Sequence, residues 1–377
     1  MDNTALKTDN GGNTSLISEI VELRNKLSSS NAPIELKENI MRTIDRLERI
    51  AKWGSYSSEF ESVDKYIDWA IRVPWGVVTE DRLDINNAKE LMDSTHYGMD
   101  TVKNLILDYL AVMQLQKRGN TVQEEEASSL RGSSANAPVL LFLGLQGVGK
   151  TSIAKSIAQA MGRKFARVSL GAIGDVRTLR GTPRHEIDAE PGQIIKALVR
   201  TQSMNPVILI DEIEKASGNV GLLNDVMAAL LEILDPEQNS AFVDHYLDYP
   251  VNLSQVFFIC TANNLGGLSA ALLDRVEMIR FTSYSDEEKH VIAKSYILPK
   301  VLKNIGLSAE QLQIKEEVWP LLIRPVGFDA GIRQLERNIA TLARSAARQI
   351  VSGHPLPIVI TPENVKEYVL PDQGPLN

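Results

Sequence analysis

The chain carries the stretch VLLFLGLQGVGKTS at residues 139–152. An apolar run leads into a glycine-rich loop of the form G-x-x-x-x-G-K-[ST], and Ile153, Ile157 and Met161 follow at helical spacing. A strand, a phosphate-binding loop and a helix in this order are typical of nucleotide-binding α/β proteins. This stretch therefore predicts an α/β fold with a nucleotide site directly after one of its strands.

Each residue type in the loop has a physical role in binding phosphate. Glycines let backbone amides converge on phosphate oxygens, and the N-terminus of the following helix adds partial positive charge. Lys150 supplies a cation for the β and γ phosphates, and Thr151 offers a hydroxyl to Mg²⁺. The residues that we expect to bind the nucleotide here are Gly144, Gly147, Val148, Gly149, Lys150, Thr151 and Ser152.

Polar residues also follow two further apolar runs. Asp211 and Glu212 come after VILI at residues 207–210; we expect Asp211 to hold Mg²⁺ through its water shell and Glu212 to polarise the attacking water. Asn263 comes shortly after VFFIC at residues 256–260, where it either contacts that water or the γ-phosphate, or is an ordinary turn asparagine. Cys260 ends this run and is expected to be a buried core thiol rather than a nucleophile.

Short apolar runs alternate with helical patterns over the middle of the chain. Such alternation indicates a mostly parallel sheet that is covered by helices on both faces. The expected strands lie at 139–143, 165–170, 207–210, 256–260 and 278–281. The expected parts are a disordered tail at 1–14, an N-terminal helical segment at 15–82, a large α/β domain at 83–282 with a flexible loop at 118–137, a small helical domain at 283–373 and a tail at 374–377.

Composition narrows the classes of function. The 377 residues carry a net charge of −8 and are 44% hydrophobic, yet no apolar run approaches the roughly 20 residues that span a bilayer. With no signal-peptide pattern at the start, we expect a cytoplasmic protein with no membrane partner. The acidic balance argues against nucleic acid as a main partner. One group of cations either faces DNA or lies at solvated strand and loop ends: Arg163, Lys164, Arg167, Arg177, Arg180 and Arg184.

Several longer motifs carry a family resemblance. They are DEIEK at 211–215, LLEILDPEQN at 230–239, DHYLD at 244–248 and LLDR at 272–275, with YIDW at 66–69, VPW at 73–75 and HYG at 96–98 upstream and AGIRQLER at 330–337 downstream. Together with the phosphate loop, they resemble the ATPase region of Lon proteases, which are AAA+ machines. The resemblance runs from Leu16 to Leu370.

The resemblance implies a P-loop AAA+ core, with a parallel sheet sandwiched by helices, an N-terminal helical segment and a C-terminal small helical domain. It also implies ATP or ADP with Mg²⁺ as cofactors and a ring, expected to be a hexamer, as the working assembly. The implied roles are Walker A for Lys150 and Thr151, Walker B for Asp211 and Glu212, sensor 1 for Asn263, an arginine finger toward the adjacent subunit for Arg275, sensor 2 at the γ-phosphate for Arg333, and adenine contact for His96, Tyr97 and Gly98.

The chain departs from the family in the loop that grips substrate in the central pore. Where the family has a Tyr-Ile pair, this chain has Glu186 and Ile187, followed by Asp188. A ring of carboxylates repels acidic segments and grips an unfolded chain less well than an aromatic ring does. We therefore expect weak or altered threading that favours basic substrates. Leu145 and Gln146 replace a Pro-Pro pair in the phosphate loop, and we expect nucleotide binding to survive this change.

The sequence stops at Asn377 without the family's serine–lysine protease domain. We therefore expect no peptidase activity from this chain. The favoured function is a Lon-like AAA+ ATPase that couples ATP hydrolysis to remodelling or unfolding of a client protein, with a separate protease as a further partner. The alternatives are the ATPase fragment of a full ATP-dependent Lon protease, an AAA+ assembly scaffold and a nucleic-acid-linked ATPase.

Overall fold

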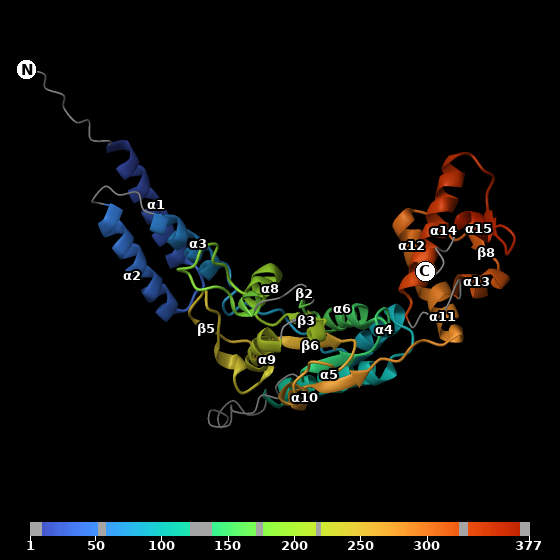
Figure 1. Cartoon of the computed structure of the whole chain (residues 1–377), viewed down its shortest axis with the longest axis horizontal. Helices are drawn as coiled ribbons and strands as arrows, with labels where there is room; N and C mark the ends of the chain where they lie inside the picture. The colour runs from blue at the N-terminus through green and yellow to red at the C-terminus, as the bar shows by residue number, and fades with distance from the viewer. Residues whose placement is uncertain are drawn as a thin grey trace, which may run out of the picture.

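The computed structural model describes residues 10–51, 58–120, 138–170, 176–215, 220–323 and 331–369. Figure 1 shows three groups of elements along the longest axis: N-terminal helices, a central α/β part and a C-terminal helical part. None of the helices in these ranges combines the length and the apolar character that crossing a bilayer requires.

The central part is built on a five-stranded sheet with the order β2-β3-β6-β1-β7. Every neighbouring pair in this sheet is parallel. Its strands are continuous apolar runs because a parallel sheet is buried on both faces. The expected parallel sheet is therefore confirmed. The strands are β1 (Leu140–Leu143), β2 (Phe165–Ser169), β3 (Val207–Asp211), β6 (Phe257–Ala262) and β7 (Glu277–Arg280).

Alternate residues of each strand point to opposite faces of the sheet, so each face has its own core. On β3, Val207 and Leu209 join one core, whereas Ile208 and Ile210 join the other. The expected cover of helices on both faces is therefore confirmed. The first core is completed by α4 (Ile85–Thr95), α5 (Asp100–Asn120) and α6 (Lys150–Met161), and the second by α8 (Gln193–Thr201) and α9 (Val220–Leu234).

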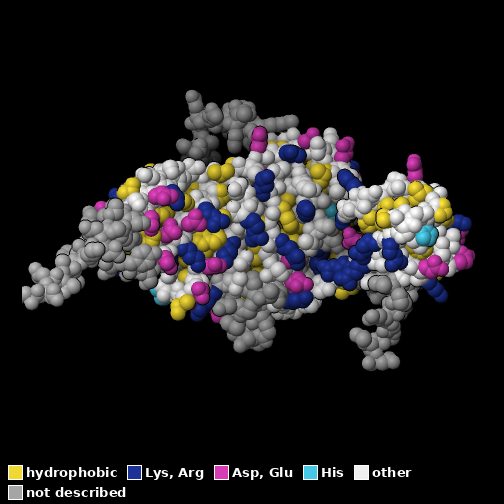
Figure 2. Space-filling view, turned by 90° about the horizontal axis from the view of Figure 1, so that it is seen from above, with side chains coloured by type: hydrophobic (Ala, Val, Ile, Leu, Met, Phe, Trp, Pro, Cys, Tyr) yellow, Lys and Arg dark blue, Asp and Glu magenta, His cyan; other side chains and the backbone are white. Residues whose placement is uncertain are grey.

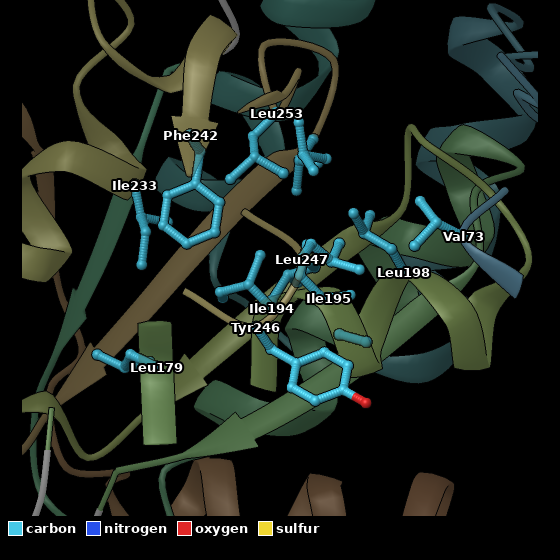
Figure 3. Close-up of a cluster of buried hydrophobic side chains, with 14 of the residues drawn as sticks. Val73, Leu179, Ile194, Ile195, Leu198, Ile233, Phe242, Tyr246, Leu247 and Leu253 are labelled. Atoms are coloured by element: carbon cyan, nitrogen blue, oxygen red, sulfur yellow. The ribbon is translucent and has the colours of Figure 1, made fainter. Parts of the chain in front are cut away.

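The second core brings together distant parts of the chain. Figure 3 shows Ile233 of α9 beside Phe242 and Leu198 of α8 beside Val73, with Ile194 and Leu247 between these pairs. Cys260 of β6 belongs to the same core and is fully buried, which raises the pKa of its thiol to about 12. The expected buried core thiol is confirmed. The short elements around this core are α7 (Arg177–Arg180), η1 (Ile213–Lys215), η2 (Asn239–Ala241), β4 (Phe242–Val243), β5 (Pro250–Val251) and α10 (Ala270–Arg275).

The N-terminal helices continue this second core rather than forming a separate one. Leu27, Ile40 and Ile44 are buried between the helices, and the Tyr66 hydroxyl donates to the carbonyl of Leu247 at 3.1 Å. The helices are α1 (Asn10–Ser29), α2 (Ile34–Ala51) and α3 (Ser58–Arg72).

The C-terminal part has its own core around Trp319, Ile339 and Leu342. A short parallel pair, β8 with β9, closes one side of it. Its elements are α11 (Asp286–Ile292), the π-helical segment η3 (Ala293–Ile297), α12 (Leu298–Ile305), β8 (Leu312–Ile314), η4 (Glu316–Val318), α13 (Trp319–Ile323), α14 (Arg333–Val351), β9 (Ile358–Ile360) and α15 (Val365–Tyr368).

Two expected irregular segments are shorter than the sequence patterns indicate. Helix α1 begins at Asn10, so the expectation of a disordered tail is wrong for residues 10–14. Helix α5 ends at Asn120, so residues 118–120 are helical and not part of a loop. In both places a helix that is nucleated by buried residues extends outward at little cost, because each added residue gains one hydrogen bond. Residues 1–9, 121–137 and 370–377 lie outside the described ranges, and the expected domain boundaries stay predictions.

Candidate functional site

The phosphate loop joins the end of β1 to the start of α6. Gly147 and Gly149 have φ values of +83° and +93°, in the left-handed region that a side chain disfavours. A Cβ on Gly149 would lie 2.9 Å from Met99 Cε, and one on Gly147 would lie 3.3 Å from Arg333 Cγ. The loop is therefore enclosed by neighbours on two sides, and the positive φ values favour glycine at both positions.

Lys150 points back into the loop and toward the sheet. Its ammonium donates to the carbonyls of Gly144, Leu145 (3.2 Å) and Ala262 (3.3 Å), and to Asn263 Oδ1 at 3.0 Å. Burial lowers the pKa of Lys150, although nearby carboxylates, first that of Glu214, act in the opposite direction. A cation held among carbonyl oxygens is able to exchange them for phosphate oxygens, which are stronger acceptors.

Both carboxylate oxygens of Asp211, at the end of β3, accept hydrogen bonds. Oδ2 accepts from Arg167 Nε at 2.8 Å and lies 2.6 Å from Arg167 Nη2, and Oδ1 accepts from the hydroxyl of Thr261. Glu212 follows with a φ of +59°, which is uncommon for a residue with a side chain. Its N–H donates to Thr261 Oγ1 at 3.0 Å, and its Oε1 accepts from Lys215 Nζ at 2.9 Å. These contacts hold an unfavourable backbone conformation at the end of the strand.

Asn263 connects two charged groups of the site. Its Oδ1 accepts from Lys150, and its Nδ2 donates to Glu214 Oε1 at 2.6 Å. The second carboxylate oxygen of Glu214 is buried without a hydrogen-bond partner among the described residues. The geometry thus favours a site residue over an ordinary turn asparagine at position 263.

Lys150, Asp211, Glu212 and Asn263 line a cavity of about 210 Å³ that the C-terminal part completes. Arg333, the first residue of α14, reaches the cavity because the N–H of Ile332 donates to the carbonyl of Gly147 at 3.1 Å. The expected site residues that line the cavity are Gly147, Gly149, Lys150, Thr151, Ser152, Asp211, Glu212, Asn263 and Arg333.

A second, larger cavity of about 560 Å³ adjoins the first and shares Gly149 and Ser152 with it. His96 and Tyr97 line this cavity on the α/β side, while Tyr284 and Ile297 line it from the chain that follows β7. The Tyr284 hydroxyl donates to the carbonyl of Val148 at 2.9 Å. The larger cavity therefore lies between the α/β part and the C-terminal part, next to the phosphate loop.

The segment at His96 is held firmly in place. The Nε2 atom of His96 lies 2.9 Å from Ser152 Oγ, and the backbone carbonyl of His96 accepts a hydrogen bond from the buried ammonium of Lys103 at 2.7 Å. Burial first, and then the charge of Lys103, lowers the pKa of His96 to about 4, so the imidazole is neutral at pH 7. Gly98 follows with a φ of +63° and forms the turn into α5.

The residues present fit a nucleoside triphosphate with Mg²⁺. A loop of glycine amides at a helix N-terminus and one ammonium suit the phosphates, and the mixed polar and apolar cavity beside it suits a nucleoside. The hydroxyl of Thr151 and the carboxylate of Asp211 are oxygen donors of the kind that Mg²⁺ prefers. Both donors line the smaller cavity.

Three residues of this site escaped the sequence analysis in this role: Arg167, Glu214 and Thr261. Arg167 lies on β2 and belongs to the basic group named above, Thr261 lies on β6 directly after the apolar run at 256–260, and Glu214 lies within the DEIEK motif. The signal that was available is a polar side chain inside or at the end of a strand that is otherwise apolar. Such a residue faces either solvent or a polar site, and only the neighbouring strand decides which.

Arg275, expected to act on an adjacent subunit, lies outside both cavities at the end of α10. Its Nε is 3.4 Å from the buried Asp235 Oδ2, and its Nη1 is 3.1 Å from Asp274 Oδ2. Its side chain is 43% exposed. The arginine is therefore held on one side by Asp235 of the LDPEQN motif and open to solvent on the other.

The expected substrate loop, residues 181–192, is closed at its base. The N–H of Thr182 donates to the carbonyl of Glu190 at 3.0 Å, and the N–H of Gly192 donates to Asp244 Oδ2 at 2.7 Å. Asp244 is fully buried, and this burial raises the pKa of its carboxyl to about 6. The buried aspartate thus connects the substrate loop to the core in Figure 3 through its neighbours Tyr246 and Leu247.

At the tip of this loop, Ile187 is 93% exposed, and Asp188 follows in the left-handed conformation at φ +57°. Glu186 does not stand free: its Oε2 accepts from Arg177 Nη1 at 2.9 Å. This ion pair offsets the charge of Glu186 within the same chain, and the expectation of weak or altered threading stays a prediction. The apolar Ile187 remains the exposed group at the tip.

The cations that were considered for DNA binding are mostly paired with carboxylates. Figure 2 shows basic and acidic side chains mixed over much of one face, with a denser basic group near the junction with the C-terminal part. An arginine that is paired with a carboxylate of the same chain is attracted less strongly to a DNA phosphate. The pairs are Arg163–Asp81, Arg167–Asp211, Arg177–Glu186, Arg180–Glu232 and Arg184–Asp248.

Comparison with known proteins agrees with the geometry. The family model "ATPase family associated with various cellular activities (AAA)" matches residues 140–284, and "Lon protease AAA+ ATPase lid domain" matches residues 303–358. The chain is 44% identical to Lon protease 2 of Thermus thermophilus over 357 residues, which are 94% of this chain and 43% of that protein. It is 39% identical to Lon protease 1 of Bacillus subtilis over 365 residues, which are 97% of this chain and 44% of that protein. The chain thus spans less than half the length of these curated relatives, and the resemblance read from the sequence motifs is confirmed.

Proposed function

We propose, from the premise that the chain is a Lon-like AAA+ ATPase region, that it binds ATP with Mg²⁺ in the two adjoining cavities and hydrolyses it there. The observation that carries this proposal is the meeting of Lys150, Asp211 and Arg333 at one cavity of about 210 Å³. These residues come from a phosphate loop, a strand end and a helix start that are far apart in the sequence. Such convergence of opposite charges in a partly closed cavity favours phosphoryl transfer.

In binding, the larger cavity receives the adenosine and the smaller cavity the phosphates. The neutral ring of His96 and the side chain of Tyr97 lie beside the base, next to Gly98. Val148, Gly147 and Gly149 offer backbone amides to the phosphates, whereas the N–H of Gly144 donates to the carbonyl of Ala262 at 3.1 Å and anchors the start of the loop. Lys150 exchanges its carbonyl partners, Gly144 among them, for phosphate oxygens. Thr151 and Asp211 hold Mg²⁺, which neutralises phosphate charge when it is bound.

In hydrolysis, Glu212 orients a water and accepts its proton while the water oxygen bonds to the γ-phosphorus, the bond to the β–γ bridging oxygen breaks and ADP leaves. The left-handed backbone of Glu212 and its bond to Thr261 hold the carboxylate at the cavity wall. Asn263 is held between Lys150 and Glu214, which supports its role in positioning that water or the γ-phosphate. Arg333 lies close enough to the phosphate loop to couple the nucleotide to the C-terminal part.

Arg275 acts in this scheme on the nucleotide of a neighbouring copy. Its place outside both cavities of its own chain and its exposed side support such a role. Hydrolysis then depends on assembly into a ring, for which six copies is the expected number. The exposed Ile187 is the group that contacts a protein client, so that the ATP cycle moves or unfolds this client. The same proposal includes that the ATP cycle serves proteolysis, which is carried out either by the same protein or by a separate one.

The test is a comparison of binding with turnover in Glu212→Gln. We expect this variant to bind a fluorescent ATP analogue within about twofold of wild type, whereas its steady-state turnover falls by about 100-fold or more because the proton acceptor is lost. Glu287→Gln removes an exposed carboxylate of α11 away from both cavities and serves as the matched control. Turnover at the wild-type rate in Glu212→Gln would rule out the assigned role.

A further inference from the structure

The contact between Arg167 and Asp211 has no part in the mechanism above. Arg167 lies on β2, at the edge of the sheet, and the register pairs Ser169 with Asp211. Because residues two apart on a strand share a face, Arg167 lies on the same face as Asp211. Two of its nitrogens lie within 2.8 Å of the same carboxylate oxygen, Asp211 Oδ2.

We propose that Arg167 is a positioning residue that occupies the carboxylate of Asp211 until Mg²⁺ arrives with the nucleotide, and so sets the Mg²⁺ concentration at which the site loads. This role presupposes the nucleotide site that is proposed above. It adds to that site a competition between a guanidinium and a metal ion for one carboxylate.

The difference in burial between the two partners supports the exchange. The Asp211 side chain is 8% exposed, so its charge needs a partner at all times. The Arg167 side chain is 53% exposed, so it is able to leave its partner and be solvated at little cost. Arg167 therefore satisfies Asp211 in the free site without holding it permanently.

The hydrogen bonds of the other carboxylate oxygen, Oδ1, explain why Arg167 and Mg²⁺ compete for Oδ2. Oδ1 accepts from the buried hydroxyl of Thr261, which also accepts from the N–H of Glu212. This chain of bonds fixes the carboxylate against β6 and leaves Oδ2 to Arg167, which lines the smaller cavity together with Asp211. A guanidinium at this oxygen repels a divalent cation, and it blocks the lone pairs that the cation or its water shell would use.

The experiment measures binding of a fluorescent ADP analogue to the full chain while Mg²⁺ is titrated. In Arg167→Gln we expect the Mg²⁺ concentration for half-maximal enhancement of binding to fall by about threefold to tenfold, since Asp211 no longer has to be released. Affinity measured in EDTA, without Mg²⁺, should stay within about twofold of wild type. Arg167→Lys, which keeps the charge but not the fork of two donors, should lie between wild type and Arg167→Gln.

Arg72→Gln is the matched control. Arg72 is also an arginine paired with an aspartate, Asp68, at 3.1 Å, and its side chain is 51% exposed, but it lies on α3 away from both cavities. Its Mg²⁺ titration should coincide with that of wild type.

An unchanged or higher Mg²⁺ requirement in Arg167→Gln would overturn the inference. Weaker binding of a non-hydrolysable ATP analogue with the Mg²⁺ dependence unchanged would make Arg167 a phosphate ligand and overturn it as well. These outcomes differ from failure of the proposed function, in which neither wild type nor Arg72→Gln binds the analogue at all.

Discussion

The smaller cavity, proposed above to hold phosphate, and the loop at residues 181–192, expected to contact substrate, use polar residues in opposite ways. In the cavity, polar side chains turn inward and are linked to one another, as in the series Lys150, Asn263 and Glu214. In the loop, the charge of Glu186 is paired at the side and apolar Ile187 extends into solvent. In the proposed function, phosphate requires charged and polar residue types in the cavity, whereas contact with a client requires only a hydrogen-bonded base of the loop and an exposed apolar tip.

The largest expected effect tests whether the cavity is complete within one chain. We expect Arg275→Gln to lower ATP turnover by about 1,000-fold, because an arginine from a neighbour no longer stabilises charge in the transition state. Binding of a fluorescent ATP analogue should stay within about twofold of wild type, since Arg275 lies outside both cavities. Turnover is measured at protein concentrations where wild type is assembled, and Arg275→Lys is the charge-matched control. Turnover at the wild-type rate in Arg275→Gln would mean that the residues of one chain suffice for ATP hydrolysis.

The next effect concerns the base of the substrate loop. Burial raises the pKa of Asp244 to about 6 from 3.8, so the folded state binds a proton more tightly than the unfolded state does. The stability from this proton is fully present below about pH 4 and is lost as the pH rises through about 6, which corresponds to about 3 kcal/mol. The measurement is the free energy of unfolding in urea at pH 4 to 7.5 for wild type and Asp244→Asn.

The difference between wild type and Asp244→Asn, rather than either curve alone, isolates this group from the other carboxylates. We expect wild type to gain stability relative to Asp244→Asn as the pH falls from 7 to 4. If the difference in unfolding free energy is constant from pH 4 to pH 7, burial does not raise the pKa of Asp244.

The smallest effects concern the tip of the loop. Ile187→Ala should reduce the stimulation of ATP turnover by an unfolded protein about fivefold, because the exposed apolar contact is lost. Glu186→Gln should change this stimulation less than twofold, since the carboxylate is already paired with Arg177. Basal turnover without the unfolded protein is the internal control. If acidic unfolded proteins stimulate Glu186→Gln more than they stimulate wild type, the Glu186 carboxylate repels acidic segments in spite of its ion pair.

The strands of the sheet and the phosphate loop were predictable because their signals are local. Residues 207–210 are apolar without interruption, as a strand buried on both faces requires, and the phosphate loop carries its function in eight consecutive positions. Helix α3 ends at Arg72, and Pro74 two positions later is a local signal for this end, because proline has no N–H to donate to a helix.

The supports of the site were not predictable in the same way. Thr261 and Arg167 contact Asp211 from two different strands, and Asp244 reaches Gly192 across more than fifty positions of the chain. The ion pair of Glu186 was not predictable either, because its partner Arg177 lies nine positions earlier, on α7. In each case the sequence shows the residue but does not show which other residue contacts it in the folded chain.

By itself the sequence determined the parallel α/β fold, the phosphate loop and the relationship to the ATPase region of Lon proteases, because these depend on patterns within short stretches. Only the tertiary structure decided that Arg333 packs on Gly147, that Arg167 holds Asp211 and that Ile187 stands exposed while Glu186 is paired. The physical reason is that a hydrogen bond or an ion pair depends on distances of about 3 Å between atoms. Such distances between remote residues exist only once the cores have closed and brought their elements together.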